Sequence, residues 1–267
     1  MVVFTYAPKW AAVGAHGCEK NPTDPRARAV DTEALPGYRN LIRSLLAEAA
    51  ADGAKVSAVS PWNEPNHPSF ISPQRAACDA HSPLLSPAIY TRFARAARDE
   101  LKGTKTQLVL GELAGKVEPS SLAGGVDEFV RALPDDVACA GAIWSQHMYT
   151  DLPYDPNFAG PVGQLERALD ARPCTKGKPI WVTETGVGAT HAGRKRSADP
   201  AQLQQDCRAQ AAALRRWSRD DRIQNVFQYE FRDAPDFPVG LADPGLTRTY
   251  PVYGMYRRAS RQGKYSC

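Results

Sequence analysis

The sequence predicts an α/β fold in which strands and helices alternate along the chain, as in a (β/α) barrel. Short segments rich in β-branched and aromatic residues alternate with segments of helical periodicity, which predicts a parallel sheet covered by helices. The segments after expected strands, such as 8–35 and 62–86, are long and rich in aromatic and polar residues, whereas those before strands are short. Long loops at the carboxyl ends of strands are typical of a barrel, although an open doubly wound sheet also binds ligands there.

Six segments have the composition of strands. The first is the run Val-Val-Phe-Thr-Tyr at residues 2–6, which ends before Pro8, and the others are short apolar runs between turn residues. The expected strands are residues 2–6, 56–60, 107–110, 140–145, 180–183 and 224–229. No GxGxxG or GxxxxGK(S/T) segment follows any of them, so the sequence gives nucleotide binding no support.

A segment with helix signals follows each strand. Leu41, Leu45, Leu46 and Ala49 place one apolar face on the first helix, which stops before a glycine. The pairs Ser86-Pro87 and Asp199-Pro200 each predict an N-cap residue followed by a proline in the first turn, and Pro134 ends the third helix. The expected helices are residues 38–51, 86–101, 126–133, 164–169, 200–217 and 251–260.

Composition is that of an ordinary globular domain. The 267 residues are 43% hydrophobic and 23% charged, with 33 basic and 29 acidic residues, so a single domain over 1–267 is expected. No stretch approaches the roughly 18–20 apolar residues that span a bilayer, so no membrane span is expected. The basic residues are scattered rather than arranged in a stripe, so no nucleic-acid partner is expected.

The cysteines indicate an oxidising compartment. All six are widely spaced and none forms a CxxC pair, so neither a zinc ribbon nor a redox motif is expected. We therefore expect a secreted or extracytoplasmic protein, although the chain opens on a strand-like run and not on a signal peptide. A chain that begins inside a strand also leads us to expect that an upstream segment is missing.

Two glutamates stand at the ends of expected strands. Glu64 lies in Trp-Asn-Glu-Pro-Asn after strand 56–60, and Glu184 lies in Trp-Val-Thr-Glu-Thr-Gly at the end of strand 180–183. Taken alone, such a glutamate is most often a solvated or capping carboxylate. Two of them in tryptophan-flanked segments fit glycosidic bond hydrolysis, in which one carboxyl group gives a proton to the leaving oxygen and the other attacks the anomeric carbon or activates water.

These motifs resemble the clan A glycoside hydrolases, with families 5 and 39 as the nearest. The resemblance implies a (β/α)8 TIM barrel, with Glu64 as the acid/base after strand four and Glu184 as the nucleophile at the end of strand seven. It implies that Asn63 binds the sugar 2-hydroxyl and that hydrolysis proceeds with retention. The chain would then hold about six βα units, strands three to eight, as an N-terminally truncated fragment. No metal or organic cofactor is implied.

Further residues agree with the resemblance. Period-two alternation puts residues 145, 147 and 149 on one face of their strand, where Tyr149 resembles the tyrosine that hydrogen-bonds the nucleophile. Taken alone, His147 is more often a structural histidine, and the resemblance favours a site role. Trp10 is expected either to stack on a sugar or to cap the core. Tyr229 stands where many clan members have a platform tryptophan, and no arginine here matches the one that holds the nucleophile ionised.

The resemblance also places the cysteines, although six cysteines allow 15 connectivities. Mapped onto strands three to eight, they predict the pairs Cys18–Cys78, Cys139–Cys174 and Cys207–Cys267. The alternative for Cys207 is a small buried apolar residue. The loops 14–35 and 67–86 are expected to shape the cleft, the second as a surface loop. The basic run 194–196 is interpreted as a solvated loop, with an anionic-sugar site as the alternative.

The substrate expected from the resemblance is a glycoside, oligosaccharide or polysaccharide. One alternative is a catalytically impaired carbohydrate-binding or scaffold protein on the same barrel, because the first two βα units are missing. A third interpretation is a transglycosylase that uses the same two glutamates with a sugar as acceptor. The sugar, the linkage and the choice between endo and exo action do not follow from the sequence.

Overall fold

The computed structural model describes the chain except for residues 22, 116–122, 150–159, 189–195 and 236. Its contacts divide the chain into two compact units. The first unit comprises Met1–Gln146 and Pro161–Pro179, and the second comprises His147–Gly160 and Ile180–Cys267. The single domain expected from the sequence stays a prediction, and each unit is described by itself.

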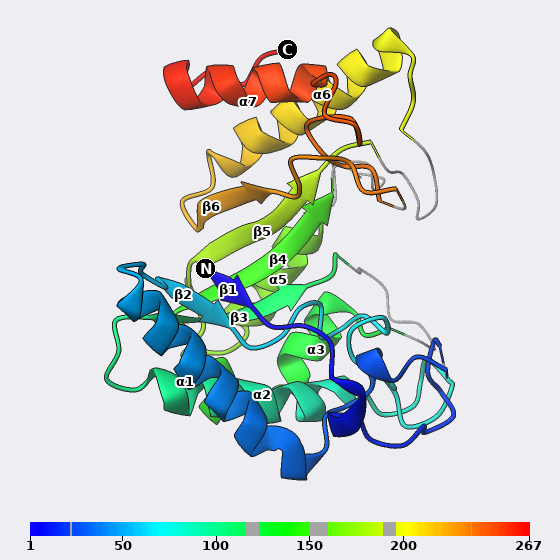
Figure 1. Cartoon of the computed structure of the whole chain (residues 1–267), viewed down its shortest axis with the longest axis vertical. Helices are drawn as coiled ribbons and strands as arrows, with labels where there is room; N and C mark the ends of the chain where they lie inside the picture. The colour runs from blue at the N-terminus through cyan, green and yellow to red at the C-terminus, as the bar shows by residue number, and fades with distance from the viewer. Residues whose placement is uncertain (22, 116–122, 150–159, 189–195, 236) are drawn as a thin grey trace. The chain divides into compact units, whose positions relative to one another are not determined.

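Strands and helices alternate throughout the described residues (Figure 1). The strands are β1 (Val2–Val3), β2 (Ala58–Ser60), β3 (Gln107–Leu113), β4 (Ile143–Tyr149), β5 (Ile180–Gly186) and β6 (Ile223–Gln228). The helices are α1 (Leu35–Ala51), α2 (Ser86–Leu101), α3 (Val126–Ala132), α4 (Asp135–Ala138), α5 (Gly160–Asp170), α6 (Pro200–Trp217) and α7 (Pro251–Gln262). The strands follow one another in chain order, and the pairings described are parallel. This is the arrangement of an incomplete (β/α) barrel.

The expected elements are all present, but some of their ends differ: β3, β4 and β5 continue past the expected ends at residues 110, 145 and 183. The short helix α4 was not expected. The first strand ends at Val3, earlier than expected, and the expected strand could not include Tyr6, whose left-handed φ of 60° is outside the strand conformation. Ser86 begins α2 and does not cap it, because its hydroxyl donates a hydrogen bond to the buried Gln74 side chain. Asp199 does cap α6, since its carboxylate accepts from the backbone N–H of Ala201 at 3.0 Å.

In the first unit, α1 and α2 lie side by side (Figure 1). Tyr38 of α1 packs edge-on against Phe93 of α2, and Phe93 stacks on Trp62 with ring centroids 4.4 Å apart. All three side chains are buried, and the Tyr38 hydroxyl donates to the Pro61 carbonyl at 2.8 Å. This aromatic cluster holds the start of the loop after β2 against the two helices.

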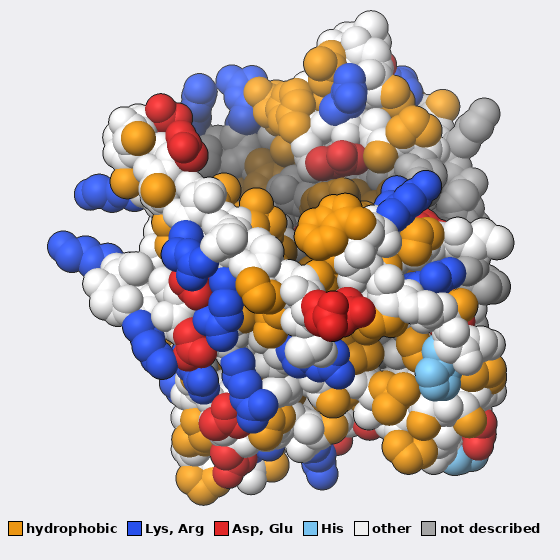
Figure 2. Space-filling model, turned by 60° about the horizontal axis from the view of Figure 1, so that its bottom comes forward, with side chains coloured by type: hydrophobic (Ala, Val, Ile, Leu, Met, Phe, Trp, Pro, Cys, Tyr) orange, Lys and Arg blue, Asp and Glu red, His pale blue; other side chains and the backbone are white. Residues whose placement is uncertain are grey.

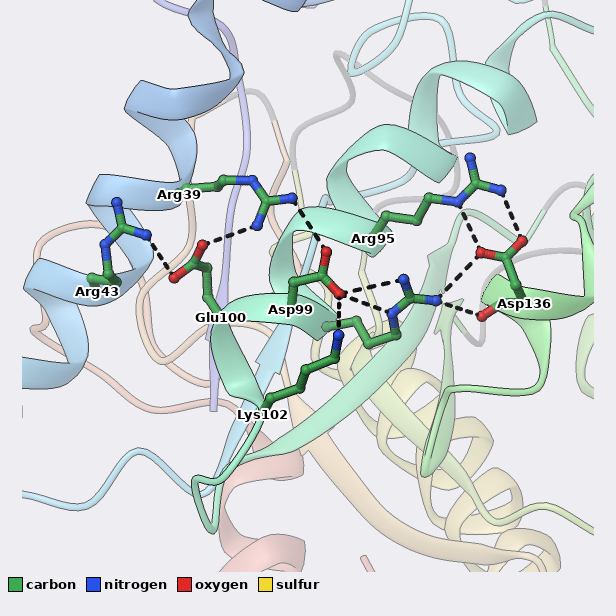
Figure 3. A network of polar contacts seen from close by, with 8 residues as sticks. Arg39, Arg43, Arg95, Asp99, Glu100, Lys102 and Asp136 are labelled. Atoms are coloured by element: carbon green, nitrogen blue, oxygen red, sulfur yellow. Dashed lines mark hydrogen bonds and ion pairs between the residues drawn. The ribbon is translucent and has the colours of Figure 1, made fainter.

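Charged side chains link α1, α2 and α4 on the surface of the first unit (Figure 3). Arg39 and Arg43 of α1 both donate to Glu100, and Arg95 donates two 2.8 Å hydrogen bonds to Asp136 of α4. Asp99 accepts from Lys102 and Arg98. Basic and acidic side chains are likewise interleaved on the left of the face shown in Figure 2.

This network makes the stability of the fold sensitive to acid. Lys102 lowers the pKa of Asp99, Arg39 lowers that of Glu100 and Arg95 lowers that of Asp136. A carboxyl group with a depressed pKa stabilises the folded state above its unfolded pKa of about 4, and the contribution disappears as the pH falls through the folded pKa. We expect the Arg95–Asp136 coupling to be present at pH 7 and to be absent in strong acid, below the lowered pKa of Asp136. Urea unfolding of the parent protein, the two single mutants and the double mutant at both pH values measures this coupling. A coupling that survives at low pH would show that it does not depend on the ionised Asp136 carboxylate.

In the second unit, β5 pairs with β6, and α6 packs beside α7 (Figure 1). Asp199 and Pro200 start α6, whose buried face includes Leu203 and Leu214. Gln210 of the same face is fully buried and donates to Thr185 of β5 at 3.1 Å and to Tyr256 of α7 at 3.0 Å. One buried amide therefore joins the strand and the two helices.

All three predicted disulfides are present. Cys18–Cys78 and Cys139–Cys174 lie in the first unit and Cys207–Cys267 in the second, with Cα atoms 5.1, 5.3 and 6.0 Å apart. These separations are within the usual range for disulfides. The alternative of Cys207 as an unpaired apolar residue is wrong, although its side chain is fully buried. Within the described part of the chain, every helix is too short or too polar to cross a membrane.

Candidate active site

Glu64 lies in the loop after β2, in the first unit. The backbone N–H of Asn63 donates to the Phe4 carbonyl at 2.8 Å, and that of Glu64 donates to the Glu112 carbonyl at 2.9 Å. The loop is thus hydrogen-bonded to the segments that follow β1 on one side and to the end of β3 on the other. Glu64 has a φ of 38°, a conformation that costs free energy in a residue with a side chain and that clusters at functional sites. Its side chain is 15% exposed.

The end of β3 bends to meet this loop. Gly111 and Glu112 both have positive φ, and the register with β4 shifts between Leu110 and Leu113. A Cβ atom at Gly111 would collide with the Ser145 carbonyl, so only glycine fits. The Glu112 side chain is buried, and its backbone N–H donates to the Ser145 hydroxyl at 2.7 Å. The bulge therefore positions the carbonyl that receives the Glu64 N–H.

Buried polar side chains hold one part of the loop 67–86, which is expected to be a surface loop: residues 71–75 are buried, whereas residues 76–79 are exposed. Asn66 is fully buried and donates to the carbonyls of Ala114 and Gly124. Gln74 is 1% exposed and donates to the Pro65 carbonyl at 2.9 Å. Arg75 is 2% exposed and forms an ion pair of 2.6 Å with Glu128. The polar composition of the loop does not reveal its buried part, because these polar groups find partners on other segments.

His67 is the ionisable side chain placed beside Glu64 in this loop. Its Nδ1 atom lies 3.9 Å from Glu64 Oε2 and accepts a 3.3 Å hydrogen bond from the backbone N–H of Ser69. The Phe70 ring lies 6.0 Å from the His67 ring. The sequence analysis did not select His67, although it directly follows the Asn-Glu-Pro-Asn motif.

Glu184 lies on β5 in the second unit, and two side chains from β4 hold its carboxylate. The Tyr149 hydroxyl donates to Glu184 Oε2 at 2.5 Å, and His147 Nδ1 lies 3.1 Å from the same oxygen. His147 is 1% exposed and Glu184 is 21% exposed. His147 and Tyr149 are two residues apart, so they share a face of the strand. The geometry orients one carboxylate oxygen and leaves the side chain partly open to solvent.

The Tyr149 ring packs against a second aromatic ring, beyond which lies a third. Its ring packs edge-on against Phe237 at 4.9 Å, and Tyr229 lies 6.3 Å from Phe237 after the end of β6. Tyr229 is 40% exposed. Tyr229 is predicted from the resemblance, whereas Phe237 is not, since its only signal in the sequence is an aromatic residue in the loop that follows the last strand.

Arg196 is buried, so neither interpretation of the basic run 194–196 holds for it. Its guanidinium donates to both oxygens of Asp233 at 3.0 and 3.1 Å, with the two side chains 4% and 2% exposed. Tyr250 donates to the same carboxylate at 2.8 Å, and the backbone N–H of Gly240 donates at 2.7 Å. Burial and the bond to Asp233 raise the pKa of Tyr250 to about 12. Residues 194 and 195 lie outside the described residues.

Trp10 lies in the short turn Lys9–Ala11 after β1. Its side chain is 76% exposed, which excludes the core-capping alternative. The first unit thus holds Trp10, Asn63 and Glu64, and the second holds His147, Tyr149, Glu184 and Tyr229. Within either unit alone, the described His, Cys, Asp and Glu side chains form no group of three placed to hold a metal ion.

Three solved structures similar to this chain are named as enzymes that cleave sugars. A GH39 β-xylosidase from Caulobacter crescentus matches 97% of this chain and 54% of its own, with a TM-score of 0.63 and 17% identity. An endo-β1,6-glucanase matches 99% of this chain and 56% of its own length, with a TM-score of 0.61 and 16% identity. A GH2 β-galacturonidase from Eisenbergiella tayi matches 91% of this chain and 40% of its own length, with a TM-score of 0.57 and 14% identity.

The chain therefore spans between 40% and 56% of the length of these three proteins. No protein-family model matches the sequence, and no curated protein is similar enough to match it. At these identities, the likeness concerns the fold. The predicted fold class is confirmed: the chain has an incomplete (β/α) barrel fold, as the glycosidase structures named above do over the part that matches.

Proposed function

We propose that this chain carries the catalytic residues of a retaining O-glycoside hydrolase, with Glu184 as nucleophile and Glu64 as acid/base. The observation that supports the proposal is that Tyr149 and His147 both contact the same oxygen of Glu184. A nucleophile must present one oxygen in a fixed direction, and strand-borne partners supply that rigidity. Both glutamates follow or end parallel strands at the edge where barrel enzymes carry their catalytic groups.

The proposed reaction has two steps. Glu184 attacks the anomeric carbon while Glu64 protonates the leaving oxygen, which gives a covalent glycosyl-enzyme. Water activated by Glu64 then releases the sugar and restores both carboxyl groups. Asn63 is proposed to bind the 2-hydroxyl, and Trp10 and Tyr229 are proposed to contact sugar rings. The mechanism requires the two carboxyl groups to lie about 5–5.5 Å apart when substrate is bound.

The proposed substrate is a β-linked glycoside, oligosaccharide or polysaccharide. The structural neighbours are named as a β-xylosidase, a β1,6-glucanase and a β-galacturonidase, so each acts on a β-linked sugar by its name. The three disulfides are compatible with the proposed extracytoplasmic location.

The test of the acid/base is Glu64→Ala. General acid catalysis contributes about 10²–10⁴-fold, so we expect a loss of that size on oligosaccharides, whose leaving groups need a proton. Aryl glycosides with acidic phenol leaving groups should lose far less in the first step. Steady-state kinetics across a series of aryl leaving groups measures the difference, and added azide should restore turnover of the activated substrates by replacing water.

Glu48→Ala is the matched control, because Glu48 is an exposed glutamate on α1. It should leave both substrate classes unaffected. If Glu64→Ala lost activity equally on every leaving group, Glu64 would not be the acid. If the unmodified chain bound sugars without turning any over, the carbohydrate-binding alternative would replace the proposed function.

A further inference from the structure

An exposed aromatic residue with an unusual backbone conformation lies three residues after the end of β1. Tyr6 has a φ of 60° and is 41% exposed. Left-handed backbone is uncommon for a bulky residue and persists where neighbouring structure imposes it. Here the next residue, Ala7, donates its N–H to the Arg26 carbonyl at 2.8 Å, and Asn63 donates to Phe4. The backbone on both sides of Tyr6 is therefore tied down, and its ring is turned out of the core.

A line of rings connects Tyr6 to Glu64. Tyr6 stacks on Phe70 with centroids 5.3 Å apart and planes 27° from parallel. Phe70 lies 6.0 Å from the His67 ring, whose Nδ1 atom is 3.9 Å from the Glu64 carboxylate. Trp62 donates to the Phe70 carbonyl at 2.9 Å, which fixes the middle of this line. All these residues belong to the first unit, so the line does not depend on the second.

The electrostatics agree with this proximity. Burial raises the pKa of the Tyr6 hydroxyl, Arg26 opposes that effect, and the charges of Asp24 and Glu64 raise it further. Arg26 lies 5.4 Å from the centre of the Tyr6 ring and donates two hydrogen bonds to Asp24, at 3.1 and 2.7 Å to Oδ2. The exposed edge of the Tyr6 ring is therefore flanked by hydrogen-bond donors from Arg26 and acceptors from Asp24. Recognition of sugar hydroxyls needs both.

We propose that Tyr6, supported by Phe70 and rimmed by Arg26 and Asp24, binds the sugar on the leaving-group side of the scissile bond. This inference rests on the proposed function, because it takes Glu64 as the acid. The leaving-group sugar is attached to the oxygen that Glu64 protonates, so it lies beside that carboxyl group. Tyr6 stands at the outer end of the line of rings that starts at Glu64, and a half-exposed ring at that position can stack on the apolar face of a sugar that extends outward from the cleaved bond.

The test compares substrates with and without a leaving-group sugar. The substrate pairs are xylobiose with β-xylosyl fluoride, gentiobiose with β-glucosyl fluoride and β1,4-galactobiose with β-galactosyl fluoride. Tyr6→Ala should lower kcat/KM about tenfold on the disaccharide and leave the fluoride unchanged, because fluoride brings no ring to stack. Tyr6→Phe keeps the ring and should retain activity on both. Phe227→Ala removes an equally exposed ring from β6 and should change neither.

Equal losses on disaccharide and fluoride, or no loss on either, would overturn the platform. A measurement of sugar binding that does not depend on turnover tests the Tyr6 platform separately from the proposed hydrolase function. Titration of the protein with each disaccharide and its monosaccharide, followed by NMR of ¹³C-labelled tyrosine rings, should move the Tyr6 signal with the disaccharide only. If Tyr6 responds but no substrate is turned over, the platform stands and the hydrolase proposal fails. If no sugar moves the Tyr6 signal, the platform is wrong.

Discussion

Glu184→Gln is expected to abolish hydrolysis, with kcat reduced by at least about 10⁴-fold on every substrate. The amide keeps the size of the side chain but removes the nucleophilic oxygen, and no other group can replace an attack that forms a covalent bond. The fold should be unaffected, because the amide oxygen still accepts the hydrogen bond of Tyr149. Kinetics on aryl glycosides together with circular dichroism checks both expectations.

Covalent trapping gives a second readout of the nucleophile. A 2-fluoro glycoside slows the second step, so the sugar should remain bound to the peptide that contains Glu184 and be seen there by mass spectrometry. Tyr149→Phe is the graded comparison, because it removes one hydrogen bond and leaves the carboxylate in place. It should lower activity much less than Glu184→Gln. Near-normal activity of Glu184→Gln, or label on another residue, would show that the nucleophile is assigned wrongly.

Asp233→Ala is expected to be the most destabilising single substitution outside the proposed catalytic residues, at about 3–5 kcal/mol. It leaves the Arg196 guanidinium, 4% exposed, without its carboxylate, and it leaves Tyr250 and the Gly240 N–H without their acceptor. A buried charge that loses its partner keeps the cost of desolvation without the compensating attraction. Urea unfolding followed by tryptophan fluorescence measures the loss.

Asp243→Ala is the matched control in the same segment of the chain. Asp243 accepts hydrogen bonds from Thr247 and from the Arg248 backbone at an exposed position, and its pKa is lowered mainly by the bond from Arg248. Its loss should destabilise the fold far less than the loss of Asp233, because the groups that it bonds can bond to water instead. If Asp233→Ala were no more destabilising than Asp243→Ala, the buried pair would not be a determinant of stability.

Local signals in the sequence were sufficient for the order of the elements and for several of their ends. The Asp199-Pro200 pair predicts the start of α6 because the cap uses only the N–H groups of the first turn. The alternation of strands and helices predicts the chain order of the sheet, because parallel strands joined by helices lie next to one another. The disulfide pairs followed once the strand order was taken from the resemblance.

The sequence likewise predicted some residues of the candidate site and not others. Glu64 and Glu184 were recognised from the residues on either side of them, and His147 and Tyr149 from the two-residue period of one strand. His67 and Phe237 were missed, because their roles come from which rings and carboxylates lie nearby and not from a motif. Arg196 was misread because its partner lies 37 residues away in the chain.

The sequence by itself therefore determined the α/β class, the order of the six strands and the two glutamates at strand ends. Each of these depends on interactions within a turn, a strand or a single βα unit. Only the tertiary structure decided the left-handed turn at Tyr6, the bulge at Gly111 and Glu112, and the burial of Arg75 and Arg196. Those features depend on hydrogen bonds or ion pairs between a backbone or charged group and a segment distant in the chain. Sequence periodicity does not identify that partner.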